Sequence, residues 1–591
     1  MRYPTLTELN TGREMVDTFL GYDHTDRIGS GEFYDMRNLT GDRYPILSQR
    51  EGRKVISRPA AAAGLIAKDA LCYVDGSAFR MGEYRVEMGL APEESGSMKQ
   101  LVSMGAYVII LPDRKYINTR DLSDYGNLDA ETVTEGNVRF SLCKYDASDY
   151  NVDYIQPSAP EAPANMELWL DTSAVPNALK QWSQTSQMWV SIGTTYVKIS
   201  SPGIGKAFAQ YDGVSISGLS GTTLHDAESG EVLLSTKDLE ALDGTAVIYA
   251  QSDDYLVIVG VLDQVYTISD SVTICRKMPE MDFVTESGNR LWGCRYGLSA
   301  AGETVNEIYA SKLGDFKNWN CFMGASTDSY AASVGTDGPF TGAVTHLGYP
   351  LFFKENCVHK VYGSYPAAFQ IQDTACRGVQ KGCGRSLAIV GETLYYKSRH
   401  GVCAFDGSLP TEISAPLGET AYRDAVGGAS GSKYYLSMAS DEGQALFCYD
   451  AERGLWFRED DLKVSCFCTC DGTAYAIDST GAILSMTGGT EIISWMAETG
   501  DLGLSSPDSK YVSRLVLRLM LEPKAELKIL VRYDFSEDWE TLGVLEGVSL
   551  RSFSVPVRPR RCDHFRLRLE GTGVCRVYSI TKTIEEGSET P

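Results

Sequence analysis

KGCGRSLAIVGETLYYKSRHGVCAFD, residues 381–406, contains a strand, a Gly turn, a second strand, a short turn and a third strand. GETLYYKS alternates apolar and polar residues, RHG turns the chain, and VCAFDG ends at Asp-Gly, a strong hairpin signal. The same plan returns with different residues at 68–82, 105–121, 348–363, 431–450 and 471–488. The sequence therefore predicts a hairpin that is repeated along the chain.

Counted on both sides of a break near residues 140–280, the pattern gives seven antiparallel units. Repeated units that cannot bury their faces alone are typical of a β-propeller. We expect about seven blades, with six and eight left open. We also expect the N-terminal arm to add a strand to the last blade, because closing the ring removes exposed strand edges.

The predicted fold class is all-β: a propeller with an inserted small β-domain and a C-terminal β-sandwich. Residues 1–135 hold the N-terminal arm, with a short helical candidate at REMVDTFLGY (13–22), and the first blades. Short, evenly spaced strands at 136–280 predict an inserted β-barrel or small sandwich. Residues 281–490 hold the remaining blades. Long alternating strands at 491–591 predict the C-terminal sandwich.

The charge of the chain limits its partners. Its 591 residues carry a net charge of -24, which opposes non-specific binding to nucleic acid or anionic membranes. Residues 510–582 differ, with 14 Lys and Arg against 9 Asp and Glu. This mildly basic end predicts an orientation against a charged partner.

Fifteen scattered cysteines without a CxxC pair favour a reducing compartment over a disulfide scaffold. Cys466, Cys468 and Cys470 alternate, so in a strand they share one face, and we interpret them as packing residues rather than a metal or redox site. MRYPTLTELNTGREMVD lacks the apolar core of a signal peptide, and no apolar run approaches ~18 residues. We expect a soluble protein without a membrane span.

Motifs for catalysis or cofactors are incomplete. SPGIGKAF (201–208) has Ser200 and Ala207 where a phosphate-binding loop needs Gly and Ser or Thr, so we interpret it as a turn. The pairs Cys357/His359 and His400/Cys403 each lie in one hairpin and predict packing and turn residues rather than zinc ligands. There is no GxSxG motif, and no carboxylate pair stands out. We therefore assign no catalytic, cofactor-binding or metal residue.

One basic stretch, RPRRCDHFRLRLEG (558–571), is a candidate contact for DNA backbone or an acidic protein. An alternative interpretation is a solvated strand edge that resists edge-to-edge pairing. Alternation supports the alternative in part, because Phe565, Leu567 and Leu569 face one way and the intervening arginines the other. The candidate residues are Arg558, Arg560, Arg561, Arg566 and Arg568.

Several segments along the chain have a texture in common with one group of known proteins: FYDMRNLTGDRYPILSQREGRK, GNRLWGC, NEIYASKLGDFKNW, YPLFFKENCVHKVYG, RSLAIVGETLYYKSRHGVCAFDG and RRCDHFRLRLEGTG. Together they resemble the β-propeller virion proteins of tailed bacteriophages, known as stabilisation, tail nozzle or tubular proteins, especially those of phages and prophages of gut Firmicutes. The resemblance covers nearly the whole chain, rests on blade texture, and brings no functional residue with it.

The resemblance implies a non-enzymatic structural subunit of the virion, made in the host bacterial cytoplasm. It implies a homo-oligomeric ring at the neck or tail, in contact with portal, adaptor or tail subunits, with DNA passing through the lumen without sequence-specific binding. Two alternatives remain: a receptor- or glycan-binding tail protein that uses the inserted domain or the sandwich, and a propeller glycoside hydrolase.

Overall fold

The hairpin within residues 381–406 forms the second and third strands of a four-stranded antiparallel sheet, where Leu394 pairs with Phe405 and Lys397 with Val402. Each of the other repeated stretches fills the same two positions of its own sheet. The structure is a computed structural model of the chain. It describes residues 11–93, 97–220, 237–299, 302–504, 510–558 and 560–586.

Seven such sheets form the blades of a β-propeller, as predicted. Blades 1 and 2 are β7 (Ala62–Lys68), β8 (Ala70–Asp75), β9 (Ala78–Met81), β10 (Tyr84–Glu87) and β11 (Gln100–Met104), β12 (Tyr107–Leu111), β13 (Lys115–Asn118), β14 (Tyr125–Asn127). Blades 3 and 4 are β27 (Phe283–Ser287), β28 (Arg290–Leu298), β29 (Thr304–Ala310), β30 (Tyr330–Ser333) and β31 (Gly342–His346), β32 (Tyr349–Phe353), β33 (Cys357–Tyr362), β34 (Gln370–Ala375).

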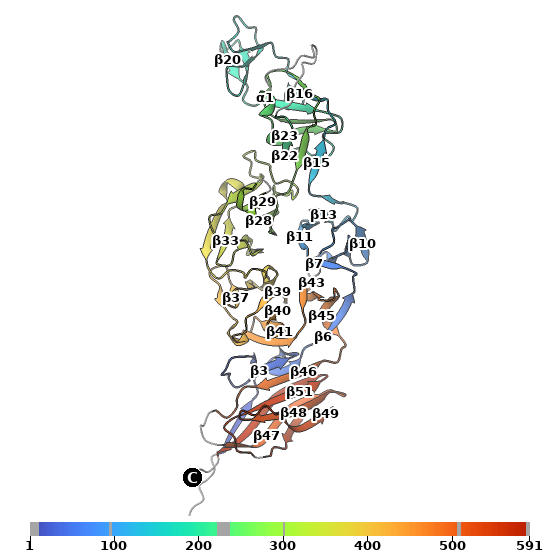
Figure 1. Cartoon of the computed structure of the whole chain (residues 1–591), viewed down its shortest axis with the longest axis vertical. Coiled ribbons are helices and arrows are strands. Elements are labelled where there is room, and N and C mark those ends of the chain that lie inside the picture. The colour runs from blue at the N-terminus through green and yellow to red at the C-terminus, as the bar shows by residue number, and fades with distance from the viewer. Residues whose placement is uncertain are drawn as a thin grey trace, which may run out of the picture.

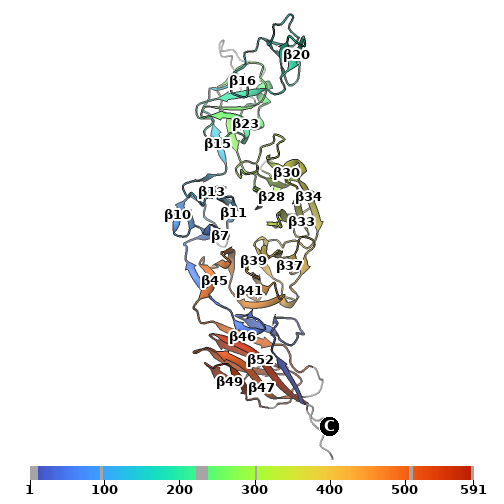
Figure 2. The ribbon, with the colours of Figure 1, turned by 180° about the vertical axis from the view of Figure 1, so that it is seen from behind.

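The remaining blades complete the ring. Blades 5 and 6 are β35 (Ala388–Val390), β36 (Thr393–Lys397), β37 (Val402–Phe405), β38 (Thr411–Glu412) and β39 (Arg423–Ser430), β40 (Lys433–Ser440), β41 (Gly443–Asp450), β42 (Leu455–Asp460). Blade 7 is β43 (Val464–Cys470), β44 (Thr473–Asp478), β45 (Ile483–Gly489) and β6 (Gly52–Ser57). The first strands of the blades contact one another around a common centre (Figures 1 and 2). Short 3-10 turns occur at Pro366–Ala368, Gly384–Ser386 and Ala415–Leu417.

The N-terminal arm closes the ring, as predicted. β6 pairs antiparallel with β45, with Val55 opposite Leu484 and Gly52 opposite Gly489. Without β6 the seventh blade would have three strands and an unpaired edge at β45, which is an aggregation hazard. The closing strand comes from a segment more than 400 residues distant in sequence.

A buried ion-pair network holds this closure. Arg53 of β6 approaches Glu459 at 2.6 Å and Asp460 at 2.6 Å, at the end of blade 6. Arg50 approaches Asp460 at 3.4 Å and Glu491 at 3.1 Å, in the segment that leaves the propeller. Burial opposes the charge of Arg53, but Glu459 and Asp460 more than offset this and raise its pKa above the ordinary value. The network joins the arm, blade 6 and the exit from blade 7.

The inserted domain leaves between blades 2 and 3 through two paired strands. Its main sheet runs in the order β15 (Ala130–Val133), β26 (Thr273–Arg276), β22 (Gly213–Ser217), β23 (Gly244–Ser252), β24 (Tyr255–Val259), β21 (Tyr196–Ser200), β16 (Val138–Cys143), β25 (Tyr266–Ile268), and α1 (Lys237–Glu240) lies beside it. Ala130 pairs with Arg276, so both ends of the insertion lie together. The sheet surrounds one core that includes Phe140, Val214 and Ile258. At the base of the inserted domain, the side-chain oxygen of the buried Asn318 of the propeller accepts a hydrogen bond from the Gly213 N–H at 3.0 Å.

A second, smaller sheet lies at the far end of the inserted domain (Figure 1). It contains β17 (Tyr154–Gln156), β18 (Leu168–Asp171), β19 (Ala178–Ser183) and β20 (Met188–Ser191), with β17 parallel to β18. Leu170 and Leu179 pack against Leu142 of the main sheet. We call this four-stranded unit the distal sheet.

The sandwich is built from both ends of the chain. Sheet A has the order β4 (Leu39–Arg43), β5 (Ile46–Gln49), β52 (Cys575–Glu586), β47 (Lys510–Leu521), β50 (Arg551–Val555), and β1 (Thr11–Val16) also pairs with β52. Sheet B has the order β2 (Gly21–Tyr22), β3 (Glu32–Arg37), β46 (Ser494–Thr499), β51 (Phe565–Thr572), β48 (Glu526–Tyr533), β49 (Glu540–Glu546).

The structure of the arm differs from two sequence-based expectations. The helical candidate at 13–22 is extended: β1 pairs with β52, with Met15 opposite Thr581, because the neighbouring strand satisfies its backbone groups. Residues 11–49 were placed with the propeller blades in the 1–135 unit, yet their strands belong to the sandwich. The arm carries four basic and seven acidic residues, so the basic balance of 510–582 does not describe the whole sandwich.

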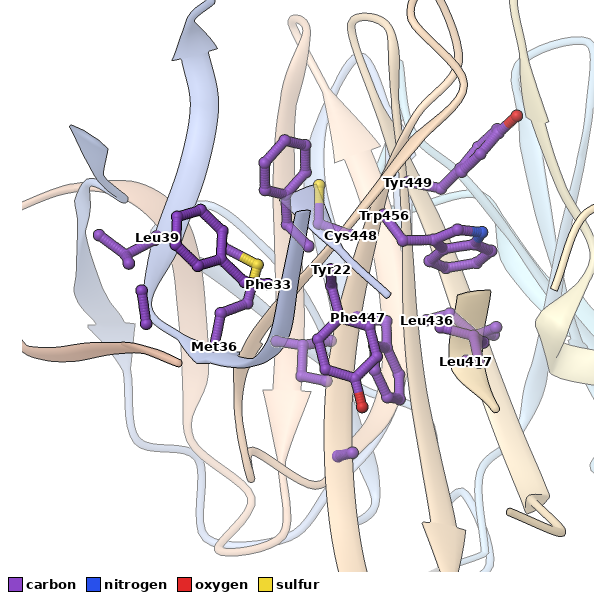
Figure 3. Close-up of a cluster of buried hydrophobic side chains, with 14 of the residues drawn as sticks. Tyr22, Phe33, Met36, Leu39, Leu417, Leu436, Phe447, Cys448, Tyr449 and Trp456 are labelled. Atoms are coloured by element: carbon purple, nitrogen blue, oxygen red, sulfur yellow. The ribbon is translucent and has the colours of Figure 1, made fainter. Parts of the chain in front are cut away.

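The arm also packs the sandwich onto blade 6 (Figure 3). Tyr22 lies 5.6 Å from the ring of Phe447, and Phe33 and Leu39 continue the same core. Gly21 has φ +83°, and a Cβ there would lie 2.3 Å from the carbonyl oxygen of Trp456. Only glycine therefore allows this approach of the arm to β42. The core runs without a break from blades 4–7 into the sandwich.

We expect Arg53→Ala to weaken ring closure strongly. Removing the guanidinium leaves Glu459, whose side chain is 6% exposed, without its closest cation, and breaking a buried pair typically costs about 3–5 kcal/mol. Denaturant unfolding should shift to lower denaturant, and amide exchange should rise in β6. Arg58→Ala, at an exposed position beyond the same strand, should change stability by less than about 0.5 kcal/mol. Equal effects of the two variants would contradict the role of the network.

Candidate functional site

The five predicted arginines fall into two groups on the sandwich. Arg558, Arg560 and Arg561 are exposed in the connection between β50 and β51. Arg560 pairs with Glu540 at 3.0 Å, and both side chains are more than half exposed. Exposed pairs of this kind contribute little to stability. These three residues present charge to solvent.

Arg566 and Arg568 lie on the outer face of sheet B, and Phe565, Leu567 and Leu569 face the core, as the alternation predicted. Both guanidinium groups converge on Glu498 of β46, which is 6% exposed. Its carboxylate lies 3.3 Å from Arg566, 2.9 Å from Arg568 and 3.6 Å from Arg532. These two arginines are thus neutralised within the sandwich, because a buried carboxylate requires compensating charge.

Aromatic rings and a cleft flank this group. Trp539 lies under the guanidinium groups of Arg532 and Arg568, at 4.9 and 4.7 Å from their carbon centres. A cleft of about 530 Å³ opens beside Arg568. Its charged lining is mixed, with acidic and basic side chains from β3, β48 and β51: Asp35, Arg37, Glu526, Arg568 and Glu570. The charged side chains of the cleft therefore provide no excess positive charge for an anion.

Asp501 completes the group at the end of β46. Its carboxylate accepts a hydrogen bond from Arg566 Nε at 2.5 Å. Burial raises the pKa of Asp501, but the hydrogen bond and charge of Arg566 lower it more, and the net pKa lies below the usual range. The pair links β51 to the segment after β46.

The distal sheet contains a candidate site that the sequence motifs did not indicate. Three of the eight tryptophans fall within its 38 residues, and this clustering was the available signal. Trp189 is central, with ring centroids 5.4 Å from Trp169 and 5.5 Å from Trp182. Trp169 is buried, whereas Trp182 and Trp189 remain half-buried. The face turned away from the main sheet is thus aromatic.

Polar groups surround these rings. Lys180 lies 4.7 Å from the Trp169 ring centroid and donates to Asp171 at 2.8 Å. The hydrogen bonds from Lys180 and Ser173 lower the pKa of Asp171 to about 2. The face therefore combines flat rings with fixed charged groups, which suits a ligand with both apolar and hydroxyl surfaces.

The cysteine triplet lies in β43, where Cys466 and Cys468 pack against the cluster around Leu65 and Ile477. Burial raises the pKa of the Cys468 thiol to about 12, which disfavours a thiolate ligand. Among the described residues, no group of three or more His, Cys, Asp or Glu side chains has the arrangement of a metal site.

The histidines of the Cys357/His359 and His400/Cys403 pairs occupy a packing position and a turn position. His359 is buried, with Nε2 2.8 Å from Thr336 Oγ1. His400 is exposed in the turn before β37. SPGIGKAF is a turn after β21, and its Ile204 and Phe208 are buried in the core of the inserted domain. No described helix is long and apolar enough to cross a membrane.

Comparisons with known proteins give distant similarity only. No family model matches the chain, and no curated protein matches it. An exo-β-1,3-galactanase from Phanerochaete chrysosporium is 8% identical over 51% of this chain and 94% of its own, with a TM-score of 0.19.

Two further solved structures are equally distant. The extracellular domain of a hybrid two-component system from B. thetaiotaomicron is 9% identical over 86% of this chain and 95% of its own, with a TM-score of 0.20. An acylaminoacyl peptidase from Pyrococcus horikoshii is 9% identical over 54% and 55%, with a TM-score of 0.23. These values carry no argument about activity.

We expect the Asp501–Arg566 link to fade in acid. A carboxylate with a depressed folded pKa stabilises the fold above its unfolded pKa of ~3.9, and this contribution is lost as pH falls through the folded value. Near pH 6 the melting temperature of the wild type should therefore be higher than that of Asp501→Asn. The two melting temperatures should converge below about pH 3. Thermal melting across a pH series measures this. Asp538→Asn, at an exposed position in the same sandwich, should follow wild type, and a constant gap for Asp501→Asn would contradict the assignment.

Proposed function

We propose that the protein is a non-enzymatic structural component of a tailed-phage virion, a neck or tail-nozzle subunit that forms a ring around the DNA path. The resemblance of its blade segments to such proteins suggested this role. The observation that carries it is the joint between domains: blades 4–7 of the propeller share one continuous core with the sandwich, and the inserted domain lies at the opposite end. A firmly joined rod suits a subunit that bears load between neighbours.

The centre of the propeller has few carboxylates on its described innermost strands. Its seven innermost strands, as described, contain two carboxylates, Glu286 of β27 and Asp424 of β39. Glu286 accepts from the Asn289 N–H at the tip of its hairpin, and Asp424 lies in an irregular part of β39 near Arg423. Glycoside hydrolysis requires two carboxylates that flank one bond. These two side chains come from different blades and have local structural partners.

The charge of the chain is compatible with a DNA path. A net charge of -24 opposes adhesion to phosphate, so DNA could slide past a ring of such subunits. On this proposal the partners are other copies of the chain and the portal, adaptor or tail subunits. The protein would be made in the bacterial cytoplasm and then reside in the virion.

Purified particles test this role directly. Quantitative mass spectrometry of virions should find the chain at a fixed small copy number relative to the portal protein. A host-cell protein that adheres by chance serves as the control, because its amount should fall with repeated gradient purification. Absence of the chain from purified virions would refute the proposal.

The distal sheet favours one second candidate, a glycan-binding tail protein. Half-buried Trp182 and Trp189 offer flat rings, and the indole N–H of Trp189 has no hydrogen-bond partner among the described residues. Sugar rings carry apolar C–H faces and hydroxyl edges, which match aromatic rings bordered by polar side chains. No specific observation favours the third candidate, a propeller glycoside hydrolase.

On this second candidate, we expect Trp182→Ala/Trp189→Ala to reduce binding of the full chain to a glycan array by at least about tenfold. Each truncation removes a stacking surface worth on the order of 1 kcal/mol or more. Met188→Ala is the matched control, because Met188 is 55% exposed on the same strand but faces the other side. A chain that binds neither glycans nor host cells would exclude this candidate.

A further inference from the structure

The outer face of sheet A carries arginines that sequence inspection did not single out. The strand registers place the outward residues of this face in four rows that cross β1, β52, β47, β50 and β5. The rows are Arg13, Thr583 and Arg514; Met15, Thr581, Val516 and Ser554; Ser579, Arg518 and Ser552; and Ser48, Arg576 and Met520. The intervening Leu515, Leu517 and Leu519 point into the sandwich core. We call these four rows the arginine face.

The arginines of this face are not neutralised. Arg13, Arg514 and Arg518 are exposed and Arg576 is half-buried, and none of the four forms an ion pair or side-chain hydrogen bond with any residue that the structure describes. Among the described residues, a carboxylate lies one row beyond each end of the face: Glu585, which accepts a hydrogen bond from the Tyr511 hydroxyl at 2.6 Å, and the exposed Glu522, two residues after Met520. The outer face of sheet B differs, because its arginines converge on Glu498.

The spacing of the charges follows from strand geometry. Arg514 and Arg518 lie four residues apart on β47, which is ~13 Å at ~3.3 Å per residue. Arg13 lies two strands from Arg514, which is ~10 Å at ~4.8 Å per strand. Ser and Thr hydroxyls, Met15 and Val516 lie between them. The charges thus form a spaced array on a broad face rather than one pocket.

The composition of the face favours a protein partner over nucleic acid. Interfaces between proteins are enriched in Arg and Met, and the four rows contain four Arg and two Met. Of the residue types that interfaces disfavour, Lys, Asp, Glu and Ala are absent from the rows, whereas Ser occurs four times. Met15 is 61% exposed, and an apolar side chain of this kind has no use against a phosphate backbone. A partner that complements the arginines must present carboxylates.

The chain itself has the required opposite charge. Its 78 acidic residues exceed its 54 basic ones, so other surfaces of a second copy can supply carboxylates. Two arginine faces cannot pair with each other around a two-fold axis, since like charges would then be opposed. Contact between the arginine face and a different, acidic surface is heterologous, and repeated heterologous contacts close into a ring when their rotation allows it.

The four rows extend from Arg514 to Met520 on β47, which is ~23 Å in length, and four adjacent strands are ~19 Å wide. The face thus offers on the order of 400 Å², about half of the ~800 Å² that each partner buries in a standard interface, so a contact here also uses surface beyond the rows. We propose that the arginine face binds an acidic surface of a second copy of this chain and so forms the head-to-tail contact of the ring. This inference depends on the proposed function only for the existence of the ring.

The test compares self-association of the full chain with that of Arg514→Glu/Arg518→Glu. Sedimentation velocity at about 50 mM salt should detect oligomers of wild type, which dissociate at about 500 mM salt because the contact is electrostatic. The double variant should require at least about tenfold higher protein concentration for the same association. The control is Lys206→Glu/Lys463→Glu, an equal charge change at exposed positions of the inserted domain and propeller, which should associate like wild type.

Thermal melting of each variant shows whether folding is preserved, as expected for exposed positions. The inference is overturned if wild type stays monomeric, if the double variant associates normally, or if wild type instead binds duplex DNA through these arginines. If virions contain the chain but the double variant still assembles, only this inference fails. If the arginine face mediates association but virions lack the chain, only the proposed function fails.

Discussion

The structure depends on how the N-terminal arm is threaded. Within about 50 residues it contributes strands to both sandwich sheets and then the outermost strand of blade 7. The buried network of Arg50 and Arg53 with Glu459, Asp460 and Glu491 lies where these two roles meet. Burial makes the charges of Arg50, Arg53 and Glu459 costly alone, so their ion pairs favour the arrangement in which all three chain segments are in place. Ring closure and sandwich assembly are therefore coupled.

This coupling explains why the two ends of the molecule differ in construction. At the sandwich end, Gly21 and Tyr22 bring the arm against Trp456 and Phe447, and the core is continuous. At the other end, the inserted domain leaves through the paired β15 and β26 and has its own core. An insertion whose ends already lie together adds little closure entropy. The propeller can thus carry a separate unit there without loss of its own order.

Local patterns in the sequence identified the blades because each hairpin is encoded within about 20 residues. Alternation, Gly turns and Asp-Gly pairs suffice for strands such as β36 and β37, and ring closure follows from the need to cover an edge. The sheets that residues 11–49 join could not be predicted in this way. β1 is short, and its partner β52 lies at the opposite end of the chain, so no local signal distinguishes a strand there from a short helix. The distal tryptophans were visible only as a cluster in sequence, since their shared face depends on strand order.

The arginines show the same limit for a functional surface. RPRRCDHFRLRLEG drew attention because its charges are consecutive, yet Arg566 and Arg568 meet Glu498 from another strand. Arg13, Arg514, Arg518 and Arg576 are scattered along the sequence, and only the registers of β1, β47 and β52 bring them onto one face. Whether an arginine is available to a partner is decided by the carboxylates on neighbouring strands. Sheet B supplies them at the centre of its outer face, whereas the described rows of the arginine face do not, so a charged contact with another molecule is better placed on sheet A.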